Sequence, residues 1–540
     1  MFSPERAVSE HCIPYSAIPH TSKLFLDYLF HFQNVSDFYP RQANRTWLAD
    51  EAKRVDYDSE RRARVADVLD LQNRAFGASE ATLAAIRKFR EGAVAVVTGQ
   101  QAGLFGGPLY SLLKTASALN AAAELNRAGI PAVAIFWLAT EDHDLAEIDH
   151  NLFSAGAGEL RELKSTSRGQ RNAPVGSVRF SGEIEQVVAE AVGLLGDSQY
   201  ARDLKASYRS GETYGSAFGK LFARIFRDHE LIFVDQLDPE LHRISAPIYV
   251  RALEDAEAID QALLARGKQL RDAGYHEQVR VTGESTLLFS LEGGERTVIH
   301  RANGGFLMGA QRFTREDLLG RVKSRPEDFS PNALLRPVVQ DYLFPTVAYF
   351  GGASEVAYFA QAAVVYERLL GRVTPILPRL SATLVNQRMQ RLLKRYRLSL
   401  TDLFEGVEQL KQLLGTRVLP ETVKETLDVT ADALRENIQK MQDALRTLDA
   451  SLVPAAEKAG RKMRYQVERL RRRAAQAELR RDQQLERDAA ELIAGLYPEK
   501  TLQERELAGI ALLAANGTDL LDRLIEAAAT ECGAHQVIET

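Results

Sequence analysis

The feature that most constrains the fold is an apolar segment followed by a glycine-rich turn and a helix start. Residues 93–97 are typical of a buried strand, and Pro108 fits the first position of a helix, where its fixed φ is favourable and its missing N–H costs nothing. The turn contains Gly99, Gly103, Gly106 and Gly107. Backbone N–H groups at such a junction can face an anion. The spacing matches neither the dinucleotide fingerprint nor the phosphate loop. The run therefore predicts a less common α/β ligand site, with a plain tight turn as the alternative.

A cluster of ionisable residues follows the next apolar segment. Residues 130–138 are apolar on both faces and are typical of a strand in a parallel sheet. The segment ends in four ionisable residues, Glu141, Asp142, His143 and Asp144. Ligands of open parallel sheets bind beyond the carboxyl ends of the strands, so these residues are candidates for acid–base chemistry. The alternative is a solvated turn that caps the next helix, since Asp is a favoured N-cap.

Polar groups also follow two later strand-like segments. Residues 344–350 lead into Gly351, Gly352 and Glu355, which repeats the pattern of strand, glycine turn and helix start. Asn332 and Arg336 precede this strand, and Arg379 and Ser381 follow the strand-like segment 372–377. An arginine at these positions can hold a carboxylate or phosphate, although a salt bridge to an acidic neighbour is an equal alternative for each.

Three zones follow one another along the chain. Residues 1–90 are predicted to form a helical segment that packs on the core. Strand and helix signals alternate over 91–398, which indicates an α/β Rossmann-type core with a parallel sheet. Two β-rich insertions are expected in it, at about 151–182 and 275–312, the second with a hairpin turning at Gly293–Gly294.

Residues 399–540 are predicted to be a helical coiled-coil region whose last helices return to the core. Apolar residues there alternate steps of four and three, as in a coiled-coil seam: Leu434, Ile438, Met441, Leu445, Leu448 and Leu452. Pro454 should interrupt the helix. The pattern fits an antiparallel hairpin or a dimerising coiled coil. The arginine run 471–473 lies among glutamates and is better explained as a solvated flank than as an RNA-binding surface.

Composition excludes several classes of protein. The net charge is -5, from 68 basic and 73 acidic residues, so no nucleic-acid partner is expected. No secretion signal or membrane span is evident, and a cytoplasmic location is expected. Two cysteines, Cys12 and Cys532, exclude a thiolate zinc cluster. His143, Glu147 and His150 would share a helical face but lack the zinc-protease pattern. We therefore expect no structural metal and leave open a catalytic Mg²⁺.

Several long segments resemble the cysteine ligase family of bacillithiol biosynthesis. They are residues 97–110, 136–137 with 141–144, 330–337, 350–358, 377–381 and 496–505. The resemblance implies a Rossmann-type core with inserted connecting segments and a coiled coil that forms a homodimer. It also implies the last step of bacillithiol synthesis, in which an amide joins the cysteine carboxylate to the glucosamine amine of glucosaminyl-malate.

The family core is similar to that of class I cysteinyl-tRNA synthetases, with two departures. Residues 107–110 lack the histidines of the synthetase nucleotide signature, and residues 378–381 lack the lysine of its mobile loop. Those synthetases also hold the cysteine thiol on zinc through protein thiolates, which this chain cannot assemble. If the chain selects cysteine, His143 and its neighbours or an apolar pocket must do so.

These patterns and the resemblance together give a set of site residues. The predicted catalytic residues are Glu141, Asp142, His143 and Asp144. The predicted nucleotide- and phosphate-binding residues are Gly99, Gln100, Gln101, Gly103, Gly107, Pro108, Tyr110, Lys114, Arg379 and Ser381. The predicted substrate-binding residues are Asn332, Arg336, Gly351, Gly352 and Glu355. ATP is expected to activate the carboxylate, and His143 to take the proton of the ammonium because imidazole is the better base near neutral pH.

Two other functions stay open on the sequence. The chain could be a related nucleotidyl or acyl transferase that acts on another amino acid or sugar amine. It could also be a non-enzymatic coiled-coil scaffold with a vestigial pocket, although the intact cluster 141–144 argues against decay.

Overall fold

The computed structural model describes residues 12–156, 158–170, 172–302, 304–529 and 533–540, and Cys532 lies outside them. Its centre is a five-stranded parallel sheet of order β13-β12-β2-β3-β6. The strands are β2 (Val94–Gln100), β3 (Ala132–Leu138), β6 (Leu231–Asp235), β12 (Thr346–Gly351) and β13 (Ile376–Pro378). This confirms the predicted Rossmann-type core. The chain leaves β2 toward β3 on one side and later returns to β12 on the other, so the topological switch point lies between β2 and β12, where ligands of such sheets bind.

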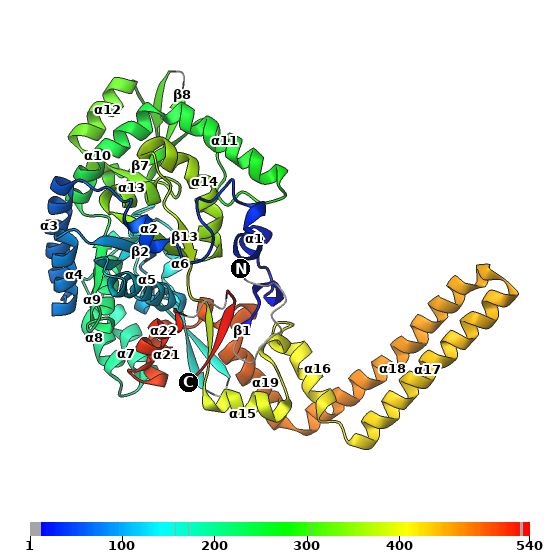
Figure 1. Cartoon of the computed structure of the whole chain (residues 1–540). Helices are drawn as coiled ribbons and strands as arrows, with labels where there is room; N and C mark the ends of the chain where they lie inside the picture. Colours follow the sequence, from blue (N-terminus) through cyan, green and yellow to red (C-terminus); the bar gives the residue numbers. More distant parts are fainter. Residues whose placement is uncertain (1–11, 157, 171, 303, 530–532) are drawn as a thin grey trace.

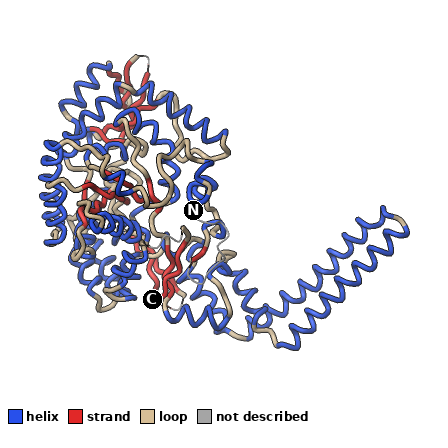
Figure 2. Tube along the Cα trace, viewed as in Figure 1, coloured by secondary structure: helices blue, strands red, loops and turns tan. Residues whose placement is uncertain are grey.

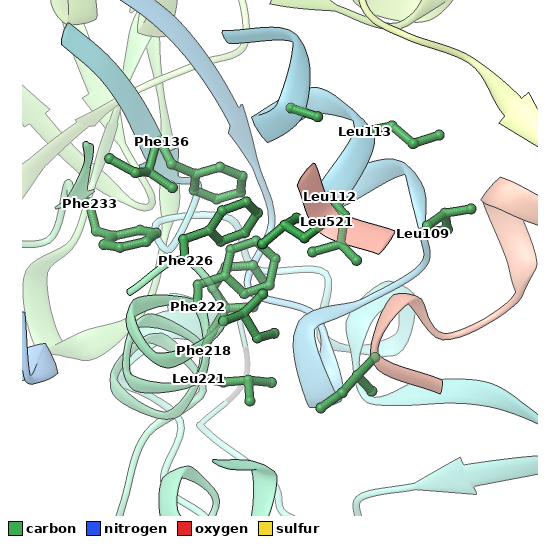
Figure 3. Close-up of a cluster of buried hydrophobic side chains, with 14 of the residues drawn as sticks. Leu109, Leu112, Leu113, Phe136, Phe218, Leu221, Phe222, Phe226, Phe233 and Leu521 are labelled. Atoms are coloured by element: carbon green, nitrogen blue, oxygen red, sulfur yellow. The ribbon is translucent and has the colours of Figure 1, made fainter. Parts of the chain in front are cut away.

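Helices cover both faces of this sheet because its strands are apolar on both sides. Along β3, Phe136 faces one helical layer and Trp137 faces the other. Figure 3 shows the first layer, in which Phe136 meets the phenylalanines of α9, with leucines of α5 and Leu521 of α22 beside them. This layer is built from α5 (Tyr110–Arg127), α9 (Tyr214–Ile225), α21 (Gly509–Asn516) and α22 (Leu520–Ala527). The opposite layer contains α1 (Lys23–Phe30), α3 (Ser59–Phe76), α4 (Glu80–Arg90), α10 (Pro239–Glu254), α11 (Ala256–Asp272), α13 (Arg336–Leu343) and α14 (Ala353–Leu370).

Two β-rich insertions interrupt the alternation, as the predicted fold class requires. The first contains α6 (Leu145–Ile148), the antiparallel pair β4 (His150–Gly156) and β5 (Glu159–Lys164), and then α7 (Ile184–Leu195) and α8 (Gln199–Ser207). The second is an antiparallel sheet that contains the expected hairpin. It consists of β7 (Ser285–Ser290), β8 (Thr297–Ala302), β9 (Gly305–Met308), β10 (Gln311–Phe313) and β11 (Phe329–Pro331), with α12 (Arg315–Ser324) beside it.

The C-terminal region contains the predicted coiled coil in the form of an antiparallel hairpin. Helices α17 (Glu421–Leu448) and α18 (Val453–Arg481) project away from the body of the molecule (Figures 1 and 2). Pro454 stands in the first turn of α18, so the interruption falls where proline predicts it. Of the predicted seam, Ile438 is buried against Gly460, but Leu448 is 78% exposed. Much of the apolar seam is therefore left uncovered within one chain.

After the hairpin the chain runs back to the core. The elements that connect the hairpin to the core are β14 (Ala382–Val385), α15 (Gln387–Tyr396) and α16 (Val407–Arg417) before it, and α19 (Gln483–Leu496) and α20 (Gln503–Glu506) after it. The last strand, β15 (His535–Glu539), lies between β14 and β1 (Cys12–Ile13), so both ends of the described chain meet in one small sheet (Figure 1). In the described ranges, no helix is both long enough and apolar enough to span a membrane.

Candidate functional site

Three cavities adjoin one another at the carboxyl ends of the parallel strands. The central cavity, about 620 Å³, lies at the switch point between the turns that follow β2 and β12 and is roofed by the second insertion. The outer cavity, about 490 Å³, lies between the β12 turn, residues 15–25 and residues 497–505. The side cavity, about 550 Å³, lies between the start of α5, the first insertion and residues 499–506. All three volumes are in the usual range for small-molecule sites, roughly 300–1,000 Å³.

The turn after β2 and the start of α5 do not form an open anion cradle. Helix α5 begins at Tyr110, two residues after Pro108. The N–H of Leu109 donates to the carbonyl of Leu507, at 2.9 Å, and Pro108 pairs with Ala508 in an isolated β-bridge. The returning C-terminal segment thus covers this helix start. Gly103, Gly107, Pro108 and Tyr110 lie instead on the wall of the side cavity.

Lys114 is buried and fully engaged. Its ammonium donates to the carbonyl of Gly99 at 2.9 Å and to Gln100 Oε1 at 2.8 Å, and it pairs with Glu355 Oε2 at 2.5 Å. Glu355 also accepts from Tyr349 and from the N–H of Gly352. Burial lowers the pKa of Lys114, whereas the Lys114 ammonium outweighs burial and holds the pKa of Glu355 below its usual value. The pair joins the β2 and β12 turns beneath the central cavity.

The four ionisable residues after β3 separate into different environments. Glu141 is 2% exposed and pairs with buried His242 at 3.0 Å, although it still lines the central cavity. Asp144 caps α6 by accepting from the N–H of Glu147, at 3.3 Å, as the capping alternative predicts. Asp142 lines the central cavity, and His143 lies exposed beside it.

Asp142 and His143 are held by Arg296, which comes from the second insertion. Arg296 Nη1 lies 3.7 Å from Asp142 Oδ1 and 3.4 Å from His143 Nδ1. Its guanidinium also donates to Pro331 O at 2.9 Å and stacks over the Phe289 ring at 3.9 Å. Burial opposes ionisation of Asp142. Hydrogen bonds from the Gln101 amide and the His143 N–H, together with Arg296, outweigh burial and hold the pKa of the Asp142 carboxyl below its usual value.

Gln101 connects this group to the β2 turn. Its Nε2 donates to Asp142 Oδ2 at 2.8 Å and to Glu147 Oε2 at 2.9 Å. On the opposite wall of the cavity, Arg336 Nη2 donates to the Tyr358 hydroxyl at 2.7 Å. Asn332 lines the same cavity, and its Oδ1 accepts hydrogen bonds from two backbone N–H groups ahead of α13.

Arg379 and Ser381 form a buried cluster with the C-terminal segment. Arg379 pairs with both carboxylate oxygens of Glu504, at 2.7 and 3.1 Å, and Ser381 Oγ donates to Glu504 at 2.9 Å. His535 Nδ1 lies 2.7 Å from Ser381 Oγ, and Nε2 lies 2.8 Å from Thr383 Oγ1. Burial lowers the pKa of His535 to about 4. Within the described chain, Arg379 Nε is buried without a hydrogen-bond partner.

Most of the predicted residues therefore converge, but on three connected cavities rather than one. The central cavity receives Gly99, Gln100, Gln101, Tyr110, Lys114, Glu141, Asp142, Asn332, Arg336, Gly352, Glu355 and Arg379. Gly351 and Ser381 line the outer cavity, and Asp144 and His143 lie outside the three walls. Sequence reasoning missed Arg296, whose local hairpin sequence gives no functional signal, and Arg505, which lies at the end of the resembling segment 496–505 but received no role.

The structure gives no support to a helical metal site around His143. Helix α6 ends at Ile148 and His150 belongs to β4, so residues 143, 147 and 150 do not share one helical face. Among the described residues, no group of three or more His, Cys, Asp or Glu side chains is placed to hold a metal ion.

Comparisons with known proteins agree with this architecture. The N-terminal Rossmann-like domain of bacillithiol biosynthesis BshC matches residues 9–380, and its C-terminal coiled-coil domain matches residues 382–540. A relative from Koribacter versatilis, "Putative cysteine ligase BshC", is 47% identical over 98% of this chain and 99% of its own. A relative of the same name from Solibacter usitatus is 37% identical over 98% of this chain and 99% of its own. A solved structure from Campylobacter jejuni, titled "putative arginyl t-RNA synthetase", is 11% identical to this chain. The match covers 86% of this chain and 98% of that chain, and its TM-score of 0.24 is too low to carry an argument.

Proposed function

Because the chain belongs to the bacillithiol biosynthesis BshC family, we propose that it catalyses the last step of that synthesis. In this reaction an amide forms between the carboxylate of cysteine and the glucosamine amine of glucosaminyl-malate. The observation that carries the proposal is the pairing of opposite charges at the switch point. Asp142 faces the central cavity as an anion, while Arg296 and Arg336 present guanidinium groups to the same space.

This arrangement suits substrates that bear both ammonium and carboxylate groups. Asp142 can hold an ammonium, and its low pKa keeps it ionised for that purpose. Among the described residues, the Arg336 side chain donates one hydrogen bond, to the Tyr358 hydroxyl, so the rest of its fork can meet a carboxylate. Arg296 is held by backbone and side-chain acceptors at the other side of Asp142. The two arginines thus flank the anion that would receive the amine.

A nucleotide fits the chemistry of the adjoining cavity. The start of α14 borders both the central and the outer cavity, and a helix N-terminus favours anions. Gly352, which lacks a Cβ, leaves space beside Arg379 Nε, the buried donor that has no hydrogen-bond partner among the described residues. ATP with Mg²⁺ would supply activation of the carboxylate, as an acyl-adenylate or an acyl-phosphate, because oxide itself is too poor a leaving group for an amine to displace.

The chain's own residues then orient the amine and take its proton. Asp142 holds the ammonium beside the activated carboxyl carbon, and His143, next to it at the rim, accepts a proton from it so that the free amine can attack. The amide bond forms as the bond between the carboxyl carbon and the adenylate or phosphate oxygen breaks. Arg296 places both side chains, since it contacts Asp142 and His143 together.

Product formation tests the proposal directly. Purified protein is mixed with glucosaminyl-malate, cysteine and Mg-ATP, and the amide-linked thiol is sought by mass spectrometry. We expect product from the wild type and a roughly 100-fold lower turnover from His143→Ala, in the usual range for loss of a general base. His300→Ala is the matched control, because His300 is exposed on β8 and lies on none of the three cavity walls.

The outcomes separate the alternatives. Product made from a different sugar amine or amino acid, and none from glucosaminyl-malate and cysteine, would reassign the chain as a related acyl or nucleotidyl transferase. Failure of folded protein to bind any nucleotide or thiol substrate would favour a scaffold. Full activity of His143→Ala would remove the base assignment while leaving the reaction in place.

We also propose that the α17–α18 hairpin forms the homodimer contact. Val429 is 69% exposed and Leu470 is 58% exposed. The salt bridge between Arg471 and Asp428, at 2.6 Å, sets these two apolar residues at the same level of the hairpin. A Val429→Glu, Leu470→Glu double variant is expected to sediment as a monomer where the wild type sediments as a dimer. Equal masses for the two proteins would place the contact elsewhere or exclude it.

A further inference from the structure

The positive side chains around the three cavities differ in whether they are already neutralised. Lys114 has three oxygen partners, and Arg379 has both its terminal nitrogens on Glu504. Arg296 is held by Ser330, Pro331 and the Asp142 carboxylate. Lys114 and Arg379 are the predicted phosphate-binding cations, and an incoming anion would have to displace a carboxylate to reach the Lys114 ammonium or the terminal nitrogens of Arg379. Arg336 keeps part of its fork free, but the proposed function assigns it to the substrate carboxylate.

Lys500 and Arg505 are different, and both come from the segment that returns from the hairpin. Within the described residues, neither side chain has a hydrogen bond or a salt bridge. Arg505 is exposed and Lys500 lines the outer cavity. Arg505 is the one described residue that lies on the walls of all three cavities. A single uncommitted guanidinium thus stands at the junction where the cavities meet.

The backbone that carries Arg505 is rigidly fixed. Its neighbour Glu504 is 2% exposed and accepts from Arg379, Ser381 and the N–H of Ala382. Gln503 exchanges hydrogen bonds with the backbone of Leu384 in β14. The buried residues on the N-terminal side of Arg505 therefore tie the segment to the core, while Arg505 itself faces the cavities. The backbone beneath Arg505 therefore loses little freedom when the side chain binds an anion.

The start of α14 lies on the same cavities as Arg505. Gly352, Ala353 and Ser354 line both the central and the outer cavity, at the N-terminus of a helix of 18 residues. Arg379 Nε is 3.8 Å from the position that a Cβ on Gly352 would occupy, and it is the buried nitrogen left without a partner. Buried donors nearly always have an acceptor. The nearby Glu355 is already paired with Lys114, so it does not leave an unbalanced negative charge at this turn.

We propose that Arg505, with Lys500 beside it, binds the phosphate chain of the nucleotide against the start of α14. This inference rests on the proposed ATP-dependent function and names the residues that would hold its nucleotide. A chain of phosphates carries several negative charges, which suits two free cations, a helix N-terminus and the unused Arg379 Nε together. The coiled-coil region thereby supplies part of the site, because both cations lie on the segment that follows the hairpin.

Binding of inorganic tripolyphosphate to the full-length protein tests the inference without any need for turnover. Isothermal titration calorimetry compares the wild type with Arg505→Gln, Arg505→Lys and Lys500→Met. We expect Arg505→Gln to weaken tripolyphosphate binding at least about tenfold, as for loss of a charge-assisted hydrogen bond. The affinity of Arg505→Lys should lie between those of the wild type and Arg505→Gln. Arg487→Gln is the control, since Arg487 is exposed on α19 and lines none of the three cavities. Circular dichroism verifies that each variant is folded, which the exposure of Arg505 leads us to expect.

A parallel titration with L-malate identifies the source of the anion. Loss of malate binding in Arg505→Gln, with tripolyphosphate binding unchanged, would assign the cation to the carboxylates of the sugar acid and overturn the proposal. Equal tripolyphosphate binding by wild type and Arg505→Gln, or none by the wild type, would overturn it as well. If tripolyphosphate binding depends on Arg505 but the wild type makes no amide product, the reaction assignment fails and the phosphate site stands.

Discussion

The buried His535 predicts a specific loss of stability in mild acid. Ser381 Oγ donates its proton to Glu504, so His535 Nδ1–H must donate to Ser381, and His535 Nε2 accepts from Thr383. Both ring nitrogens are thus satisfied by the neutral imidazole. A proton added to Nε2 would face the Thr383 hydroxyl in a fully buried site. Burial accordingly lowers the pKa of His535 to about 4, against 6.5 for an ordinary histidine.

The sign and size of the effect follow from proton linkage. As pH falls through 6.5 the unfolded chain protonates this histidine and the folded chain does not, so the unfolded state gains stability until the pH reaches about 4. The contribution of His535 to the free energy of unfolding should therefore fall by about 2 kcal/mol between pH 7 and pH 5, and by about 3 kcal/mol by pH 4. The pKa of Glu504 is lowered, so its own contribution is present above the ordinary carboxylate range and is lost only in stronger acid.

Urea unfolding followed by circular dichroism at pH 7 and pH 5 measures the loss. The matched variants are His535→Gln, which removes the titrating group, and His300→Gln, which removes an exposed histidine on β8. His535→Gln should be less stable at pH 7, by about 1–3 kcal/mol for disturbed buried hydrogen bonds, but should lose less on acidification than the wild type. His300→Gln should behave as the wild type does. The reasoning is refuted if His535→Gln and the wild type lose the same free energy between the two pH values.

Three further substitutions test the geometry of the central cavity. Glu355→Gln leaves Lys114 buried without its anion and should lower the free energy of unfolding by about 3–5 kcal/mol. A Lys114→Met, Glu355→Gln double variant should recover part of that loss, and a double variant no more stable than Glu355→Gln alone would contradict this pairing. Gly99→Ala places a Cβ 2.7 Å from the carbonyl of Trp137 and should cost about 1–3 kcal/mol in urea unfolding, whereas Gly193→Ala, in open space on α7, should be neutral or stabilising. Arg296→Gln should lower kcat/KM about tenfold or more with an unchanged far-ultraviolet spectrum, and undiminished kcat/KM would exclude its role in placing Asp142 and His143.

The parallel sheet and the polar groups at its carboxyl edge could be predicted because their signals are local, whereas the strand order, and with it the switch point, came from the structure. Each core strand is a short apolar run bounded by glycine, proline or charge, and the alternation with helices fixes a parallel arrangement. The polar groups after β2, β3 and β12 then meet at one edge of the sheet, and Asp142, Gln101 and Glu355 do line the same cavity. The break in the helix at Pro454 could be predicted as well, and Pro454 stands in the first turn of α18, but the choice between a hairpin and a dimerising coiled coil stayed open on the sequence.

Whether each charged side chain is paired with another protein group could not be predicted, because its partner lies far along the sequence. Arg379 and Glu504 are 125 residues apart, and Ser381 and His535 are 154 apart. No local pattern distinguishes an arginine that will meet a buried carboxylate from one that will meet a ligand. The same holds for Lys114, whose partner Glu355 approaches only when β12 pairs with β2.

The cations of the site come from two parts of the chain, the strand ends of the core and the segment that follows the hairpin. The segments that a Rossmann-type core supplies at its strand ends hold most of their own cations in ion pairs, which stabilise the turns after β2, β12 and β13. The uncommitted cations Lys500 and Arg505 arrive on the segment that follows the hairpin, and the Glu504–Arg379 pair fixes that segment to the core. If Arg505 binds phosphate, its position depends on the buried contacts that Gln503 and Glu504 make with the core. A Glu504→Gln variant leaves Arg379 without its anion and loosens the segment that carries Arg505. It should therefore weaken tripolyphosphate binding, even though it removes a negative charge that would repel phosphate. Tighter binding would show that the freed Arg379, and not the position of Arg505, controls the site.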